Sequence, residues 1–231
     1  AASDVYKRQL IFKVLKRGDK LTAALNSGDP KELSDMGLRY DLTLPLSRFY
    51  AANKDKLPHP FKVIQTDRVF RAERPQKGRL RQFHQVGIEW LGAPDPAADA
   101  ECIIMLMEFY KRLGFDLSKL RLLINSMGDA QCRPAYREQV KQFILDHADE
   151  MCDECREHYE QVKRYLDAAG IEYVEDPTLV RGLDYYTRTV FEVEAPGAGV
   201  GSIGGGGRYD GLVELEGGTV SYTHLTLPTI A

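Results

Sequence analysis

A dense group of basic side chains within residues 66–81 is the first feature of this 231-residue sequence that could do chemistry. The group gives the segment a local charge of +4, whereas the whole chain carries −3: Arg68, Arg71, Arg74, Lys77, Arg79 and Arg81 against Asp67 and Glu73. A guanidinium group presents a planar fork that matches two phosphate oxygens, so such clustering is typical of a phosphate clamp. A solvated basic loop has the same composition, and charge alone does not separate the two interpretations.

The residues that follow predict a strand with two different faces, because side chains alternate along a strand. One face carries a cation, an aromatic ring, an amide, a glycine and a carboxylate: Arg81, Phe83, Gln85, Gly87 and Glu89. The other face is the better core candidate and consists of Gln82, His84, Val86, Ile88 and Trp90. We expect its histidine to point inward. A mid-strand glycine often marks the close approach of a ligand, which favours the first face as a binding surface. A solvent-exposed strand has a similar pattern.

Two later segments combine aromatic, basic and glycine residues. Residues 179–188 place adjacent tyrosines, Tyr185 and Tyr186, after Arg181, and one of the pair is equally suited to plugging a core. Residues 204–207 are four consecutive glycines, which let a backbone approach a ligand with no Cβ in the way, and Arg208 and Tyr209 follow. The segment is not a P-loop, because no Gly-Lys-Ser/Thr sequence follows the glycines.

The elements that must position these residues mix helices with hairpins. Residues 10–15 and 20–25 predict one hairpin, and strands over residues 61–73 and 80–91 predict another with a long loop. Helices are expected from Thr43 as N-cap to residue 53, from Asp95 to Gly114, over residues 134–148, and over residues 155–169. Strands over residues 119–125, 171–175 and 189–194 complete an α+β fold with a mostly antiparallel sheet.

Composition excludes several classes of protein. The longest apolar run is six residues, far short of the ~20 that a transmembrane helix needs. The first residues show no apolar segment typical of a signal peptide. We therefore expect a cytoplasmic protein without a membrane partner. Four cysteines are too few for a disulfide framework. Cys152 and Cys155 form one Cys-x-x-Cys pair without further ligands at zinc spacing, so no metal site is expected.

Several of these segments together resemble histidyl-tRNA synthetase, a family of class II aminoacyl-tRNA synthetases. Residues 68–89 resemble the motif 2 hairpin of that family, residues 179–186 and 205–211 its two histidine-specific signatures, and residues 39–43 its substrate-binding turn. The resemblance covers residues 10–218. It implies a class II synthetase-like antiparallel sheet flanked by helices and truncated at both ends, with a shortened helical insertion around residues 130–170. Residues 1–9 and 219–231 resemble neither the family nor the rest of the chain, and we expect a non-native leader and tail.

The resemblance implies ATP-dependent activation of L-histidine to histidyl-adenylate and transfer of the histidyl group to tRNA(His). Arg71 and Arg181 are implied as catalytic residues that hold the α-phosphate and the substrate carboxylate from opposite sides. ATP is implied to contact Arg71, Glu73 (adenine), Arg79 (outer phosphates) and Phe83 (stacking). Histidine is implied to contact Asp41, Leu42, Thr43, Arg71, Gln85, Glu89, Arg181, Tyr185, Tyr186 and Tyr209. Mg²⁺ is implied by the triphosphate, with no protein ligand assigned.

The family's motif 1, motif 3 and anticodon-binding domain have no counterpart in these 231 residues. We therefore expect a homodimer only in an intact parent, and no activity from this fragment alone. The nearest alternative is the synthetase-like regulatory subunit of ATP phosphoribosyltransferase, which lacks the full set of residues matched here at 181–186. A non-catalytic RNA-binding module is a third interpretation. A net charge of −3 predicts only a weak, salt-sensitive affinity for RNA.

Overall fold

A long antiparallel hairpin is the central element of the computed structural model, which describes residues 10–129, 151–179, 186–199, 201–212 and 229–230. Strand β3 (Phe61–Phe70) pairs with β4 (Gln82–Leu91) in the register Phe61↔Leu91 to Phe70↔Gln82. The predicted hairpin with a long loop is therefore confirmed. The short strand β9 (Thr229–Ile230) pairs with the other edge of β4. The assignment of residues 219–231 as a non-native tail stays a prediction, although two of these residues pair with β4.

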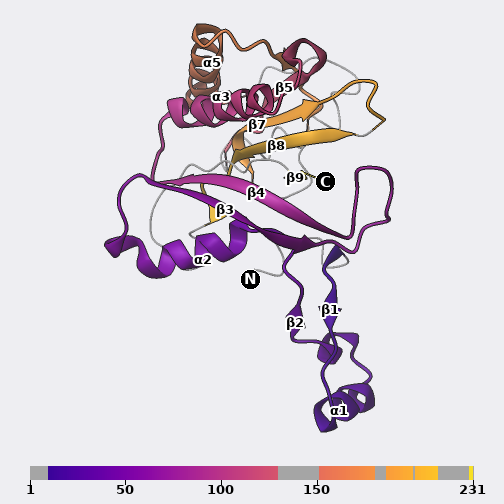
Figure 1. The fold of residues 1–231 in the computed structure, drawn as a ribbon. Coiled ribbons are helices and arrows are strands. Elements are labelled where there is room, and N and C mark those ends of the chain that lie inside the picture. Colours follow the sequence, from indigo (N-terminus) through magenta and orange to yellow (C-terminus); the bar gives the residue numbers. More distant parts are fainter. Residues whose placement is uncertain (1–9, 130–150, 180–185, 200, 213–228, 231) are drawn as a thin grey trace.

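A second sheet of four strands has the order β6-β5-β7-β8. Its strands are β5 (Arg121–Ser126), β6 (Val174–Glu175), β7 (Thr187–Glu194) and β8 (Ser202–Arg208), and among them only β5 and β6 run parallel. Helices α3 (Pro96–Arg112) and α5 (Asp153–Ala168) cover one side of it (Figure 1). The expected α+β fold with mostly antiparallel sheets is confirmed.

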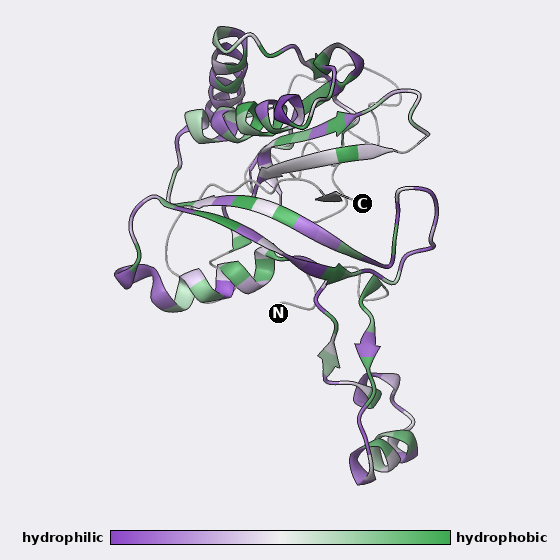
Figure 2. Ribbon diagram, viewed as in Figure 1, coloured by the Kyte–Doolittle hydropathy of each residue, from purple (hydrophilic) through white to green (hydrophobic). Residues whose placement is uncertain are grey.

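One apolar core joins the two sheets. Trp90 of β4 packs in the same cluster as Ile103 of α3, Leu166 of α5, Ile124 of β5 and Phe191 of β7. Figure 2 shows polar residues interrupting the apolar ones along β3 and β4, so the hairpin is not a purely apolar layer. Both faces of β4 are therefore committed, one to this core through Trp90 and the other to the polar residues described below.

Local signals account for the helices that were predicted correctly. Asp95 caps α3 by accepting a hydrogen bond from the Ala97 amide at 2.7 Å, with Pro96 at the first helical position. Gly114 follows α3 with φ +86°, and Gly170 follows α5 with φ +67°, a left-handed backbone that favours glycine. The helix expected over residues 134–148 lies outside the described residues.

The hairpin expected over residues 10–25 is wrong. Residues 19–27 form helix α1 (Asp19–Ser27) instead, and β1 (Lys13–Val14) pairs with β2 (Met36–Gly37). Residues 20–25 are Lys, Leu, Thr, Ala, Ala and Leu, mostly good helix formers, and Leu21, Ala24 and Leu25 have helical spacing. Figure 1 shows α1 with β1 and β2 as an arm that extends away from the two sheets.

One further element differs from expectation. The strand expected over residues 171–175 is confined to β6. Helix α2 (Thr43–Asn53) spans the residues predicted for it. Three short 3₁₀ turns complete the described chain, at Pro30–Leu33, Lys54–Lys56 and Leu117–Lys119. No described helix combines the length and apolar character that a membrane crossing requires.

Candidate active site

The polar face of β4 is buried, contrary to expectation, while the expected core face is buried only at its far end. Gln85 is 4% exposed and Glu89 is fully buried, whereas His84 is exposed on the other face. The expectation of a core histidine at position 84 is therefore wrong. On the face expected to form the core, Trp90 is buried and Ile88 packs against the main core, whereas Gln82 is exposed. The physical reason is that α2 and neighbouring loops cover the polar face, where hydrogen bonds offset the cost of burying polar groups.

Glu89 is the hub of this polar face. Its Oε1 accepts hydrogen bonds from the Thr43 hydroxyl at 3.0 Å and from Gln65 Nε2 at 2.5 Å, and its Oε2 accepts one from the Tyr209 hydroxyl. The donors come from α2, from β3 and from the segment after β8. A buried carboxylate is costly unless it is hydrogen-bonded, so these contacts hold three distant segments in one arrangement.

The start of α2 places a second carboxylate beside this face. Thr43 is not the N-cap, because its hydroxyl bonds Glu89; instead Asp41 Oδ1 accepts from the Leu44 amide at 3.3 Å. Asp41 is 3% exposed. Leu42 packs in a small apolar cluster with Val69 and Phe83. The turn at residues 41–43 therefore contacts both strands of the hairpin.

Arg71 lies beside two aromatic rings at the loop end of the hairpin, directly after β3. Its guanidinium carbon is 4.6 Å from the centre of the Tyr40 ring and 5.1 Å from that of Phe83, and its Nε donates to the Tyr40 carbonyl at 3.4 Å. Cation–π contacts of this kind hold a guanidinium in place. Burial raises the pKa of Tyr40, with Arg71 opposing part of the shift.

Glu73 and Arg79 meet each other across the loop of the hairpin. Their side chains form an ion pair of 3.1 Å, with Arg79 largely exposed. Such exposed pairs contribute little to stability and exchange easily. The loop is also anchored at its tip, because Lys77 Nζ donates to the Ala198 carbonyl at 3.0 Å in the turn between β7 and β8.

Two tyrosines close the deep end of the polar face. Tyr186 and Tyr209 are buried, and their rings meet edge to face with centres 6.4 Å apart. The glycine strand β8 makes room for this packing: a Cβ at Gly207 would lie 2.7 Å from Tyr186 Cδ1. At this position the glycine serves side-chain packing, which the sequence interpretation of the glycines did not include. Arg181 and Tyr185 lie outside the described residues.

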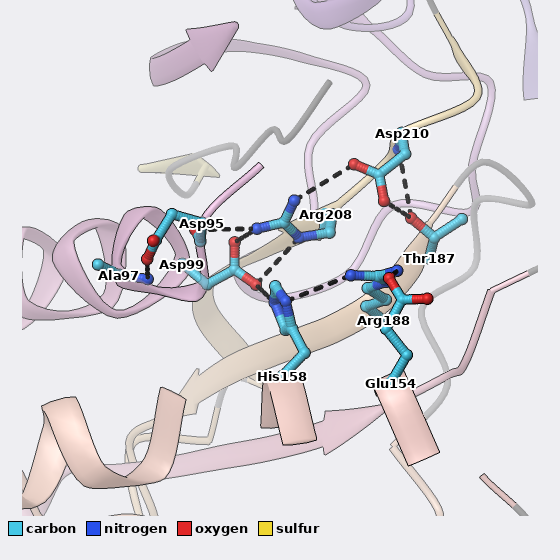
Figure 3. Close-up of polar contacts among 9 residues, drawn as sticks. All are labelled: Asp95, Ala97, Asp99, Glu154, His158, Thr187, Arg188, Arg208 and Asp210. Carbon is cyan, nitrogen blue, oxygen red and sulfur yellow. Dashed lines mark hydrogen bonds and ion pairs between the residues drawn. The ribbon is translucent and has the colours of Figure 1, made fainter. Parts of the chain in front are cut away.

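A buried ionic network, which sequence reasoning missed, is centred on Arg208, the residue before Tyr209 (Figure 3). Arg208 is 1% exposed and donates to both carboxylate oxygens of Asp99, at 2.7 and 3.2 Å, and to Asp210 at 3.3 Å. His158 Nε2 lies 2.7 Å from Asp99 Oδ2. These partners are 59 and 109 residues from Asp99 in the sequence, so no local pattern reveals them.

The network also sets the protonation of its carboxylates. Burial pushes the pKa of Asp99 upward, but the Arg208 charge and the His158 hydrogen bond outweigh it, so the pKa is lowered overall. The pKa of Asp210 is raised, because burial outweighs the opposing charge of Arg208. The lowered pKa keeps Asp99 ionised beside the arginine at neutral pH.

Comparison with known proteins identifies one family. The family model for histidyl-tRNA synthetase matches residues 13–149 and 142–221. The histidine–tRNA ligase of Desulforamulus reducens is 42% identical over 220 residues, 78% of this chain and 52% of that protein. The histidine–tRNA ligase of Moorella thermoacetica is 37% identical over 255 residues, 94% of this chain and 56% of that protein. The chain thus spans about half the length of the curated relatives it matches.

Solved structures show the same fold. The apo histidyl-tRNA synthetase of S. aureus aligns over 95% of this chain and 63% of that one, at 34% identity and a TM-score of 0.70. A Bacillus halodurans chain described as an ATP phosphoribosyltransferase regulatory subunit/histidyl-tRNA synthetase aligns over 97% of this chain and 67% of that one, with a TM-score of 0.72. At 21% identity that likeness shows the fold alone. The sheets, the helices and the basic hairpin define a class II aminoacyl-tRNA synthetase fold. The chain belongs to the histidyl-tRNA synthetase family.

The packing of Tyr186 against β8 generates a prediction for Gly207→Ala. The new Cβ would also lie 2.9 Å from the Thr189 carbonyl oxygen and from Val190 Cγ1, so we expect the free energy of unfolding to fall by about 1–3 kcal/mol. Chemical denaturation measures the change. Gly201→Ala is the matched control, because a Cβ there meets nothing within 4 Å. Equal stability of the two variants would contradict the packing role.

The buried network generates a pH prediction for Asp99→Asn. Because the pKa of Asp99 is lowered in the folded state, its ionised form stabilises the fold above the ordinary pKa of about 4, and this stabilisation is lost as pH falls through the folded pKa. We expect the variant to lose about 3 kcal/mol at neutral pH and to depend less on pH below about 4. Unfolding curves across pH measure both, with the exposed Asp55→Asn as control. Parallel pH profiles for Asp99→Asn and the unmodified chain would refute the assignment.

Proposed function

We propose that this chain carries the part of a histidine–tRNA ligase that activates L-histidine with ATP to histidyl-adenylate, before transfer to tRNA(His). The observation that carries the proposal is the row of side chains along the buried face of β4, from Phe83 through Gln85 to Glu89. Residues six apart on a strand are separated by about 20 Å, which suits an extended adenylate better than a single small molecule. Family membership supplies the reaction.

The amino acid is proposed to bind between Gln85 and Glu89. Gln85 Oε1 is buried, and no donor among the described residues reaches it, so it is suited to accept a hydrogen bond from the ammonium group of histidine. Gly87, between the two, has no side chain to occupy the space. Asp41 and Thr43 are proposed to border the ammonium group, and Tyr186 and Tyr209 to line the rest of the histidine site. The family resemblance adds three further residues to this site: Leu42, Tyr185 and Arg181.

The nucleotide is proposed to bind at the outer end of the row. Phe83 would stack on the adenine, Glu73 would contact its polar edge, and Arg79 would reach the outer phosphates once it leaves Glu73. Arg71 is already held beside Phe83, where its guanidinium would stabilise negative charge on the α-phosphate. Arg181 is proposed as the second catalytic arginine, on the opposite side of that phosphate.

The reaction in this arrangement is a displacement at phosphorus. A histidine carboxylate oxygen attacks the α-phosphorus, the bond from that phosphorus to the bridging oxygen breaks, and pyrophosphate leaves. Positioning and fixed positive charge supply the catalysis, so no proton-transfer base is assigned. Mg²⁺ is proposed to accompany the triphosphate. The described residues of this site hold no cluster of three potential metal ligands, so we assign it no protein ligand.

The compartment, the oligomeric state and the tRNA partner of the parent protein are also proposed from the family resemblance. We propose a cytoplasmic homodimer that uses tRNA(His) as a partner, with activity requiring the remainder of the parent chain. The alternative is the regulatory subunit of ATP phosphoribosyltransferase, and a binding test must distinguish it from the ligase. Residues 181–186, which carry the full first signature of the synthetase, favour the ligase.

Binding of a non-hydrolysable histidyl-adenylate analogue to the 231-residue chain tests the proposal. We expect binding by calorimetry, weakened about tenfold to a hundredfold in Arg71→Ala, because a hydrogen bond to a charged group is worth about 1.5–3 kcal/mol. Arg74→Ala, an exposed arginine of the same loop, is the matched control. Circular dichroism verifies that each variant is folded.

Two outcomes would overturn the assignment. One is a folded chain that binds histidine but not the adenylate analogue, as expected of a regulatory subunit. The other is equal affinity for the histidyl and the alanyl analogues, which would exclude a histidine-specific site.

A further inference from the structure

Three potential metal ligands from two distant segments meet outside the site described above. The ligand atoms of Asp129, Cys152 and Cys155 all lie within 4.8 Å of one another. Asp129 follows strand β5, whereas the cysteines stand at the start of helix α5, more than 20 residues later in the sequence. The sequence shows only a Cys-x-x-Cys pair, and the fold adds the carboxylate that was missing from it.

The backbone holds these donors in place. Cys152 is the residue immediately before α5, and its carbonyl accepts from the Arg156 amide at 3.0 Å; Cys155 is fully buried in the first turn. On the other side, the residue before Asp129 is tied to β7, because the Arg188 amide donates to the Gly128 carbonyl at 2.8 Å. The cluster therefore follows from two anchored segments rather than from a chance meeting of surface side chains.

Charge balance favours a divalent cation at this cluster. Two thiolates and one carboxylate would bring three negative charges together. Arg188 supplies one positive charge, with its Nη2 3.9 Å from Asp129 Oδ2 and 2.5 Å from Glu154 Oε1. Figure 3 shows the Arg188 side chain directed toward Glu154. Because Glu154 is the closer partner of Arg188, the four negative groups, which are the three ligands and Glu154, keep a net charge of −3 beside the one arginine. One divalent ion would offset two of these three charges.

We propose that Asp129, Cys152 and Cys155 bind one Zn²⁺ ion. Thiolates select Zn²⁺ over hard ions such as Mg²⁺, and Cys, His and Asp are its usual protein ligands. With metal–ligand bonds of about 2.0–2.3 Å, two ligands of a tetrahedral ion are about 3.5 Å apart, which small side-chain rotations reach from the present arrangement. A water molecule would complete the coordination.

The ion would clamp the loop after β5 to the start of α5. Both segments contact Arg188 of β7, the strand whose first residues lie beside the Arg208 network. The role is therefore structural and independent of the proposed histidine activation. It stabilises the folded state because only that state adds Asp129 to the cysteine pair and so binds the ion more tightly than the unfolded chain does.

Cobalt substitution tests the proposal on the 231-residue chain. The chain is kept reduced with a phosphine, stripped with a chelator and titrated with Co²⁺. We expect one equivalent to bind, with a sulfur-to-cobalt charge-transfer absorption and the visible bands of a tetrahedral ion, both removed by Zn²⁺. Thermal unfolding in the presence of Zn²⁺ is the second measurement, and we expect a higher Tm.

Matched variants separate the three ligands from adventitious binding. Cys152→Ser removes a partly exposed ligand, and we expect the Co²⁺ affinity to fall by at least roughly a hundredfold and the Zn²⁺-dependent rise in Tm to vanish. Asp129→Asn is expected to keep the sulfur absorption but to weaken binding at least roughly tenfold. Glu157→Gln, an exposed carboxylate on the same helix, and Cys102→Ala, a thiol in α3, should bind as the unmodified chain does.

Three results would overturn the proposal. The first is a reduced, folded chain that gives no sulfur-to-cobalt absorption. The second is Co²⁺ binding that survives Cys152→Ser unchanged, which would assign the ion to another place. The third is unchanged affinity in Asp129→Asn, which would leave only a cysteine pair without the carboxylate.

Discussion

The burial of one carboxylate, Glu89, is the constraint on which the arrangement of this protein depends. A charge removed from water must find compensating donors, and here they come from β3, from α2 and from the end of β8. Each donor is useless for this purpose unless its own segment is correctly placed. The hydrogen bonds of one side chain therefore couple the hairpin, the turn at residues 41–43 and the glycine strand into one unit.

The same physical solution occurs a second time, one residue before Tyr209. Arg208 is buried against Asp99, and Asp99 in turn contacts His158, so α3, α5 and β8 are joined by buried polar contacts as well as by apolar packing. Tyr209 thus stands between two buried ionic groups, with its hydroxyl on Glu89 and its backbone neighbour on Asp99. The position of its ring is determined by both.

Local signals in the sequence predicted much of the fold, while long-range polar partners could not be predicted. The cap at Asp95 and the hairpin of β3 and β4 depend on neighbouring residues and were found. The burial of the polar face of β4 was not predicted, because hydropathy cannot show that Gln65, Thr43 and Tyr209 would satisfy Glu89 from 24, 46 and 120 residues away. The arm at residues 19–27 was misjudged because short apolar runs fit strands and helices equally.

The ion pair between Glu73 and Arg79 affects how strongly nucleotide binding depends on ionic strength. Under the proposed role, an arriving polyphosphate does not meet a bare guanidinium but displaces a carboxylate from it. Dissolved ions screen both attractions, the one that is broken and the one that forms. Added salt therefore weakens the ion pair that must break as well as the contact that replaces it, and the two effects partly cancel. The affinity for the nucleotide would fall with added salt less steeply than the number of cations in the loop suggests.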